Sequence, residues 1–123
     1  MIKGLRMASI WSEDLTKKLL PFYRDTVGLP LTMESPGFVI FGDPNAPALA
    51  LGTHSDVHGA ATDPARHMVA FDVDDCVAES ARLKAAGVEF VEEPNKLPNG
   101  LTLATFRDPE GNLIQLFQFD TPL

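Results

Sequence analysis

An internal repeat is the feature that most constrains this sequence. Residues 7–14 (MASIWSED) are echoed by residues 68–75 (MVAFDVDD). Each copy alternates like a half-buried strand, ends in an acidic pair and leads into a helical stretch, which closes at Gly28 in the first copy and at Gly87 in the second. A repeat of this length is one supersecondary unit used twice. We therefore expect two half-domains that share a cavity, with the functional site inside it.

The first helical stretch is expected to begin after Ser12, a good N-cap residue, and to end at Gly28. Pro21 lies inside it and predicts a kink or two short helices in sequence. In the second copy, Asp74 or Asp75 is the expected N-cap, and Gly87 ends the helix.

Short apolar runs bounded by glycine, proline, asparagine and aspartate predict three strands after each helix. These runs are residues 31–34, 38–41, 48–52, 88–92, 101–106 and 113–119, with the turns of the first module at 35–37 and 42–47 and a polar loop at 93–100. The order is β-α-β-β-β twice, which predicts an α+β fold in which two βαβββ modules form a curled mixed sheet. We expect residues 1–123 to form one domain, with a first module at 1–53, a linker at 54–65 and a second module at 66–123.

Composition narrows the class of function. The chain has 123 residues, a formal net charge of −7 and one cysteine, Cys76. The negative charge argues against nucleic acid as a partner and is compatible with a cationic ligand. No apolar run reaches the ~20 residues that span a bilayer, and no signal peptide is evident, so we expect no membrane association. The lone cysteine fits a cytoplasmic protein, and its aliphatic neighbours predict a buried, inert thiol.

Three segments together resemble the vicinal-oxygen-chelate superfamily of glyoxalases, bleomycin resistance proteins and extradiol dioxygenases. They are residues 13–29 with Phe-Tyr before Val-Gly-Leu, residues 71–88 with the second helix, and residues 106–116 with Asp-Pro-Glu-Gly-Asn. The resemblance implies a glyoxalase-like fold and a homodimer. It does not specify an activity, because the superfamily includes lyases, isomerases, dioxygenases and metal-free binding proteins.

The resemblance also indicates where metal-dependent members hold their ion, at two strand positions per module. The first position is Met7, or Ala8 if the alignment is anchored in the first helix, which carries one residue more than the family pattern. The others are a residue within 49–52, Met68 and Gln115. Only Gln115 could bind a metal, and one neutral ligand does not hold a divalent ion against water. We therefore expect no metal and no cofactor.

The chain has three histidines, His54, His58 and His67. His54 and His58 fall in the expected linker, where no helix sets their spacing, so polar loop contacts are the simpler interpretation; if they bound a metal, Asp56 or Asp63 would supply the carboxylate. His67 lies one residue from the expected metal position, and one step along a strand reverses the face. His54 follows a cavity-lining strand and is the best candidate for a ligand contact or a general base.

Alternation along the strands predicts an apolar pocket lined by methionine and aromatic side chains with a few polar points. Phe38 and Ile40 alternate with Val39 and Phe41, so one pair or the other joins it. The candidate ligand-binding residues are Met7, Ser9, Trp11, Phe38, Ile40, His54, Met68, Gln115 and Phe117. The alternative is that these side chains fill a core.

Three functions compete. The leading hypothesis is a metal-free protein that sequesters an apolar or cationic organic compound. The second is a metal-dependent lyase or dioxygenase of the glyoxalase type that uses non-standard ligands among His54, His67 and Gln115. The third is a domain with a filled pocket whose function resides in a partner surface.

Overall fold

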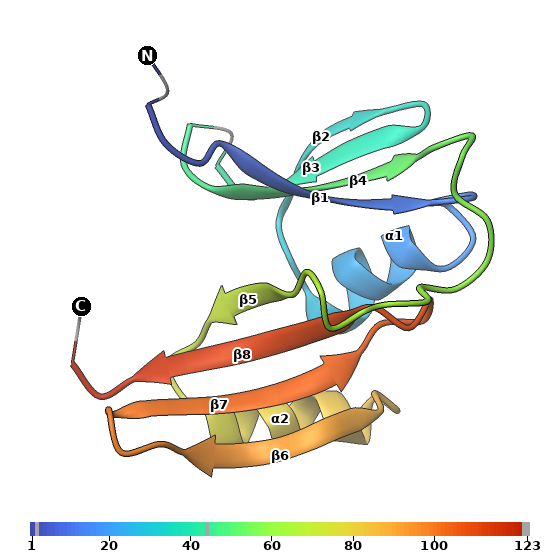
Figure 1. Cartoon of the computed structure of the whole chain (residues 1–123). Helices are drawn as coiled ribbons and strands as arrows, with labels where there is room; N and C mark the ends of the chain where they lie inside the picture. Colours follow the sequence, from blue (N-terminus) through green and yellow to red (C-terminus); the bar gives the residue numbers. More distant parts are fainter. Residues whose placement is uncertain (2, 44, 122–123) are drawn as a thin grey trace. The chain divides into compact units, whose positions relative to one another are not determined.

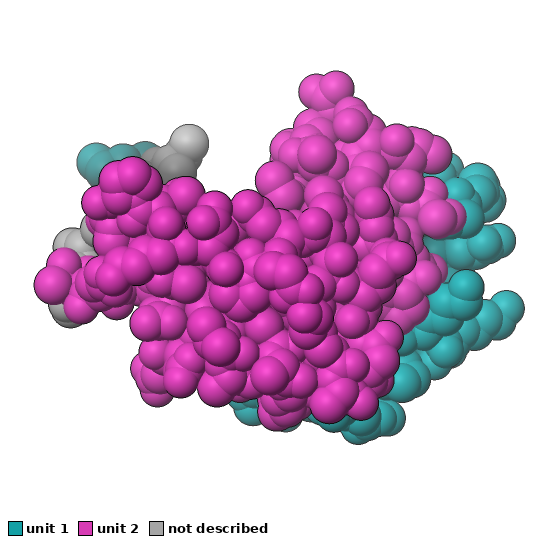
Figure 2. All heavy atoms as spheres, turned by 90° about the horizontal axis from the view of Figure 1, so that it is seen from below, with its two compact units in different colours: residues 1–59 teal, residues 60–123 magenta. Residues whose placement is uncertain are grey.

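The computed structural model describes residues 1, 3–43 and 45–121. The chain forms two compact units, residues 1–59 and 60–123, which Figure 2 distinguishes by colour. Each unit is a βαβββ module of the glyoxalase-like type with its own four-stranded mixed sheet (Figure 1). The repeat in the sequence is therefore a repeat in the structure.

The first unit contains one helical segment and four strands. Its elements are β1 (Met7–Ser12), α1 (Leu19–Pro21), the π-helix η1 (Phe22–Val27), β2 (Leu31–Ser35), β3 (Phe38–Phe41) and β4 (Ala48–Thr53). The strand order is β1-β4-β3-β2, with β1 parallel to β4 and the other pairs antiparallel. Pro44, in the turn that the sequence predicts at 42–47, lies outside the described residues.

The second unit repeats this plan. Its elements are β5 (Val69–Asp72), α2 (Cys76–Ala85), β6 (Phe90–Lys96), β7 (Leu101–Arg107) and β8 (Leu113–Phe119). The strand order β5-β8-β7-β6 corresponds to that of the first sheet, and β5 runs parallel to β8.

The first helical segment starts later than the sequence indicates. Ser12 belongs to β1, and its Oγ accepts a hydrogen bond from the Asp14 backbone N–H at 3.1 Å. The Asp14 carboxylate then accepts from the backbone N–H and hydroxyl of Thr16, which closes a turn instead of a helix. Pro21 stands at the junction of α1 and η1, so the expected pair of short helices is present. Gly28 ends η1 with φ +86°, a conformation that favours glycine.

Two boundaries of the second unit are informative. The side chain of Asp75 caps α2 by accepting from the backbone N–H of Ala78 at 3.0 Å. Strand β6 continues to Lys96, through residues that the sequence predicts to be loop. The pairing of β6 with β7 shifts register between Glu92 and Asn95, and this irregularity on an edge strand accommodates Pro94.

In each unit one face of the sheet is the core and carries the helix (Figure 1). In the first unit, the buried strand residues on this face are Ile10, Val39, Phe41, Leu49 and Leu51. Leu15, in the turn before α1, and the helical residues Leu19 and Tyr23 are buried as well. In the second unit, α2 packs on β6, β7 and β8, and the buried residues are Cys76, Leu83, Ala104, Phe106, Ile114 and Leu116. We call the opposite side of each sheet its open face. Among the described residues, no helix is long and apolar enough to cross a membrane.

Candidate functional site

The strand register gathers the candidate residues of the first unit on its open face. Trp11 and Phe38 both pair with Gly52, and Ser9 and Ile40 both pair with Ala50. Because side chains of paired residues point to the same side, these rows share one face. Val39 and Phe41 point to the core face instead. The open face therefore carries Met7, Ser9, Trp11, Phe38, Ile40, Ala48, Ala50 and Gly52.

Trp11 is the largest side chain on this face and is 42% exposed. Its indole covers the space above Gly52, where a Cβ would fall 2.2 Å from Cζ3. The ring centroid lies 6.2 Å from that of Phe38 and 5.6 Å from that of His54, which it meets edge-on. Three rings thus meet at one end of β1, β3 and β4.

The rest of the face is a small apolar floor. Ile40, Ala48 and Ala50 are buried, and Met7 and Phe38 pack against them. Because the side chains of Ala48 and Ala50 are short, they do not cover the indole, and part of Trp11 stays accessible.

His54 follows β4, and its ring orientation is fixed by the backbone. Its Nδ1 accepts a hydrogen bond from the Asp56 backbone N–H at 3.0 Å. A neutral imidazole that accepts at Nδ1 carries its proton on Nε2. His54 is therefore arranged to donate a hydrogen bond through Nε2–H. His54 could act as a general base only if the hydrogen bond from the Asp56 backbone N–H to Nδ1 broke, because Nδ1 carries the lone pair that would accept a proton. His58 lies 3.9 Å from the Glu13 carboxylate, on the exposed surface.

Gln115 joins a row of polar side chains on the open face of the second sheet. It pairs with Ala70 on β5 and with Thr105 on β7. Its Nε2 donates to Thr105 Oγ1 at 3.3 Å, and Thr105 Oγ1 in turn donates to Glu92 Oε1 at 3.3 Å. Thr105 is only 5% exposed. The row orients the carboxamide and leaves its Oε1 available as an acceptor.

Phe117 lies two residues farther along the same face, where it pairs with Asp72. A hollow of about 560 Å³ lies at this end of β5 and β8. We call it the β5 hollow; its lining residues are Ala70, Phe71, Asp72, Val73, Asp74, Phe117, Gln118 and Phe119. Phe117 is among the candidate residues predicted from sequence. Asp72 and Phe119 are not, although alternation from Ala70 and Phe117 places both on the open face. Met68, 43% exposed, directly precedes β5.

The donor set does not fit a divalent metal ion. The positions that the family resemblance indicates offer the thioethers of Met7 and Met68 and the carboxamide of Gln115, whose nitrogen already bonds Thr105. His67 is exposed and lies outside β5. Within residues 1, 3–43 and 45–121, no three histidine, cysteine, aspartate or glutamate side chains gather closely enough to hold an ion.

Cys76 is buried, as the sequence indicates, at the start of α2. Burial raises the pKa of its thiol; the nearby Ser80 hydroxyl opposes this effect, and the negative charge of Asp75 adds to it. Because the thiolate is the reactive form, Cys76 is an inert part of the core.

Comparison with known proteins gives one family. The family model described as "Glyoxalase/Bleomycin resistance protein/Dioxygenase superfamily" matches residues 7–116. No protein from the curated set matches the chain. Among solved structures, TnmS3, an antibiotic binding protein from Streptomyces sp. CB03234, is 28% identical, with a TM-score of 0.75 over 97% of this chain and 98% of that chain.

Two further structures agree with this fold. A superfamily member from Sphaerobacter thermophilus DSM 20745 is 26% identical, with a TM-score of 0.74 over 95% of this chain and 98% of that chain. A putative glyoxalase family protein from Bacillus anthracis has a TM-score of 0.77 over 98% of both chains. At 18% identity, the second similarity concerns the fold alone.

Proposed function

The chain belongs to the glyoxalase/bleomycin resistance protein/dioxygenase superfamily, and on this premise we propose that it is a binding protein that sequesters an apolar or cationic organic compound without a metal ion. The binding residues in this proposal are Met7, Ser9, Trp11, Phe38, Ile40 and His54 in the first unit and Met68, Gln115 and Phe117 in the second.

The observation that carries the proposal is the position of Trp11. A tryptophan that only filled a core would lie on the helix-covered face, but Trp11 stands on the open face with nearly half of its surface exposed. The rings of Phe38 and His54 both contact its indole. An indole packed in this way is a stacking surface for a planar or cationic molecule, because it loses little freedom on binding.

Each unit also offers a polar group that can orient a ligand. His54 offers a donor at Nε2, and Gln115 offers an acceptor at Oε1. A mostly apolar surface with a few oriented polar groups is the usual profile of a small-molecule site. TnmS3 is described as an antibiotic binding protein, which supports an organic compound of this general kind as the ligand.

A metal-dependent lyase or dioxygenase that uses His54, His67 and Gln115 is the competing function. Elemental analysis of the purified protein separates the two. We expect less than a stoichiometric amount of any transition metal, and one ion per chain would overturn the metal-free proposal.

The proposed site can be tested with a screen of planar aromatic compounds and organic amines. Trp11 is the only tryptophan, so its fluorescence reports directly on this face. We expect at least one compound to quench it saturably and to raise the melting temperature, since binding to the folded state alone stabilises that state.

The matched variants are Phe38→Leu on the open face and Phe90→Leu in the second unit. Phe90 contacts Phe106, a core residue of the second unit, with ring centroids 5.5 Å apart, and it is not among the proposed binding residues. Phe38→Leu should weaken binding of the quenching compound severalfold, and Phe90→Leu should not. Equal effects of the two variants, or a screen without any saturable response, would contradict the proposal.

A further inference from the structure

We propose that the β5 hollow binds an organic cation, held by the carboxylate of Asp72 and the rings of Phe117 and Phe119. This inference rests on the proposed function, because Phe117 belongs to both. It goes further because it names the class of ligand for the second unit and adds Asp72 and Phe119 to the binding residues.

The hollow has the size of a ligand site. Its volume of about 560 Å³ falls within the ~300–1,000 Å³ that small-molecule pockets occupy. Its walls are the end of β5, the segment that leads to α2, and the last residues of β8. All of these belong to one unit, so the hollow is formed without any other part of the chain.

Its apolar wall is aromatic. Phe117 and Phe119 stand two residues apart on β8 and therefore on the same face. Their centroids are 6.1 Å apart and their planes are perpendicular. Both rings are only half-buried, so each retains accessible surface. An accessible ring face attracts an ammonium or guanidinium group through its quadrupole.

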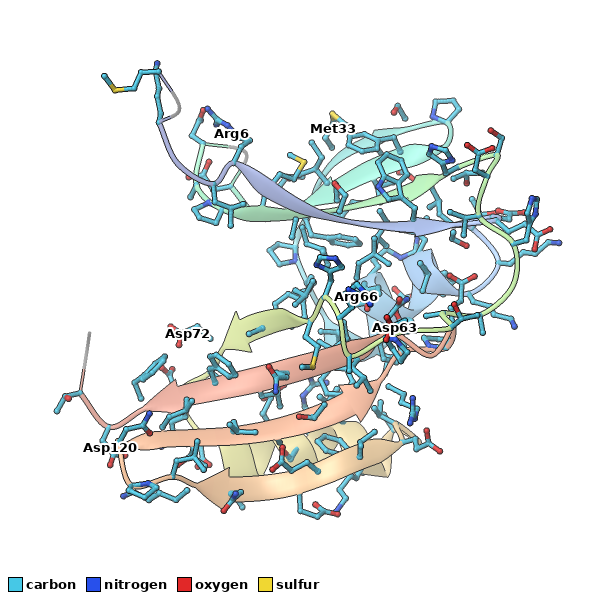
Figure 3. The ribbon with its side chains drawn as sticks, viewed as in Figure 1. Arg6, Met33, Asp63, Arg66, Asp72 and Asp120 are labelled. Atoms are coloured by element: carbon cyan, nitrogen blue, oxygen red, sulfur yellow. The ribbon has the colours of Figure 1, made fainter. Side chains whose placement is uncertain are left out.

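Its polar wall is negative. Asp72 pairs with Phe117 across β5 and β8, so its carboxylate projects from the same face of the sheet as the ring. Asp72 is labelled beside β5 in Figure 3. In the part of the chain that the structure describes, neither Asp72 nor Asp74 has an ion pair or side-chain hydrogen bond. Residues 68–81 contain no lysine, arginine or histidine. Lys96 is paired with Asp120 at 2.9 Å and does not neutralise this wall.

An anion would find few donors here, although the hollow lies near the start of α2. The backbone N–H of Cys76 already donates to Gln118 Oε1 at 2.8 Å, and that of Ala78 donates to Asp75. These hydrogen bonds use the helix donors that would otherwise attract a negative group. The combination of two rings and a carboxylate without a partner thus selects a cation with apolar substituents.

The test is a titration of the full chain, labelled with nitrogen-15, followed by amide NMR. The probe is benzyltrimethylammonium, and benzyl alcohol is its neutral control. We expect saturable shifts at residues 70–74 and 117–119 with the cation and none that saturate with the alcohol. An equal response to both compounds, a response elsewhere, or no saturation would overturn the proposal.

Variants test whether the cation is bound by the carboxylate of Asp72 or is attracted only by the negative net charge of the chain. Asp72→Asn should weaken binding about three- to fivefold, the range of one solvent-exposed charge contact, and Phe117→Leu should do so by a similar factor. Asp72→Glu should retain binding. Glu34→Gln removes the same charge in the first unit and should leave the affinity unchanged. If Asp72→Asn and Glu34→Gln have equal effects, the cation is attracted only by net charge and the proposed site is wrong.

Failure here is distinguishable from failure of the proposed function. The cation titration reads amides of the second unit, whereas the compound screen reads Trp11 in the first. Saturable quenching of Trp11 without shifts at the β5 hollow would refute only the cation site.

Discussion

The indole of Trp11 occupies the space in which Gly52, its partner on β4, would carry a side chain. A Cβ at Gly52 would lie 2.2 Å from Cζ3 and 2.5 Å from Cε3. Because Gly52 on β4 has no side chain, the indole of Trp11 on β1 can occupy this position.

Gly52→Ala tests this relationship. Because the ring must move to admit the methyl group, we expect the free energy of unfolding to fall by about 1–3 kcal/mol, as for other overpacked sites. Urea unfolding measures the loss. In a Trp11→Leu background the same substitution should cost much less, since the clashing ring is gone. Additive losses in this double-mutant cycle would refute the relationship.

Variants in the row of Gln115, Thr105 and Glu92 distinguish a structural role of Gln115 from a role in ligand binding. Thr105→Val leaves the Gln115 amide without its partner and should lower stability by about 1 kcal/mol, whereas Thr105→Ser should retain most of it. Gln115→Leu should leave stability nearly unchanged and weaken binding of any compound found in the screen. Denaturant unfolding and titrations of each variant check both effects. A large stability loss without a change in binding would make Gln115 a structural residue.

Asp108 organises the turn between β7 and β8. It is 4% exposed and accepts from the backbone N–H groups of Glu110 and Asn112 and from the Asn112 side chain, at 2.8–3.0 Å. Asp108→Ala leaves these donors unpaired and should lower the free energy of unfolding by about 2–3 kcal/mol. Asp63→Ala, at an exposed carboxylate paired with Arg66, is the control and should cost less than about 1 kcal/mol. Similar losses would contradict this role of Asp108.

Cys76 predicts a pH dependence of stability. Burial raises the pKa of its thiol in the folded state, so the protonated form is favoured there. Its contribution is fully present below the pKa of the unfolded thiol, about 8.5, and is lost as the pH rises through the higher folded value. Relative to Cys76→Ala, the native chain should therefore lose stability between pH 7 and pH 10. Urea unfolding at both pH values, with reductant present, measures the difference; parallel curves would contradict it.

We also predict a homodimer. Each four-stranded sheet has two end strands, β1 and β2 in one unit and β5 and β6 in the other, and a second chain can cover exposed strand edges. Light scattering at micromolar concentration should give twice the 13.4 kDa of one chain. The mass of a single chain would refute the prediction.

The strands were predictable where turns bound them. The bounds of β3 and β8 equal those expected from sequence, because proline, glycine and asparagine mark their ends. The sequence predicts a loop at residues 93–96, which is wrong because β6 continues to Lys96. No sequence rule indicates that an edge strand will continue past Pro94 by shifting register. Alternation placed Met7, Ser9 and Trp11 on one face of β1, but it left open which pair from β3 joins them, and the pairing of both strands with β4 decides for Phe38 and Ile40. The contact between Thr105 and Glu92 was not predictable, because it depends on the shifted pairing of β6 with β7.

The π-helix between Pro21 and Gly28 has a consequence for the length of the chain. A π-helical turn holds about one residue more than an α-helical turn, and the family resemblance implies that this segment carries one residue more than the family pattern. We expect the wider turn to absorb the extra residue, so that the strands on either side of the helix keep their register. Anchoring the sequence in the helix selects Ala8, which pairs with Leu49 and lies on the core face of β1. A polypeptide can thus change length between two strands and still present the same side chains, because the helix, and not the sheet, accommodates the difference.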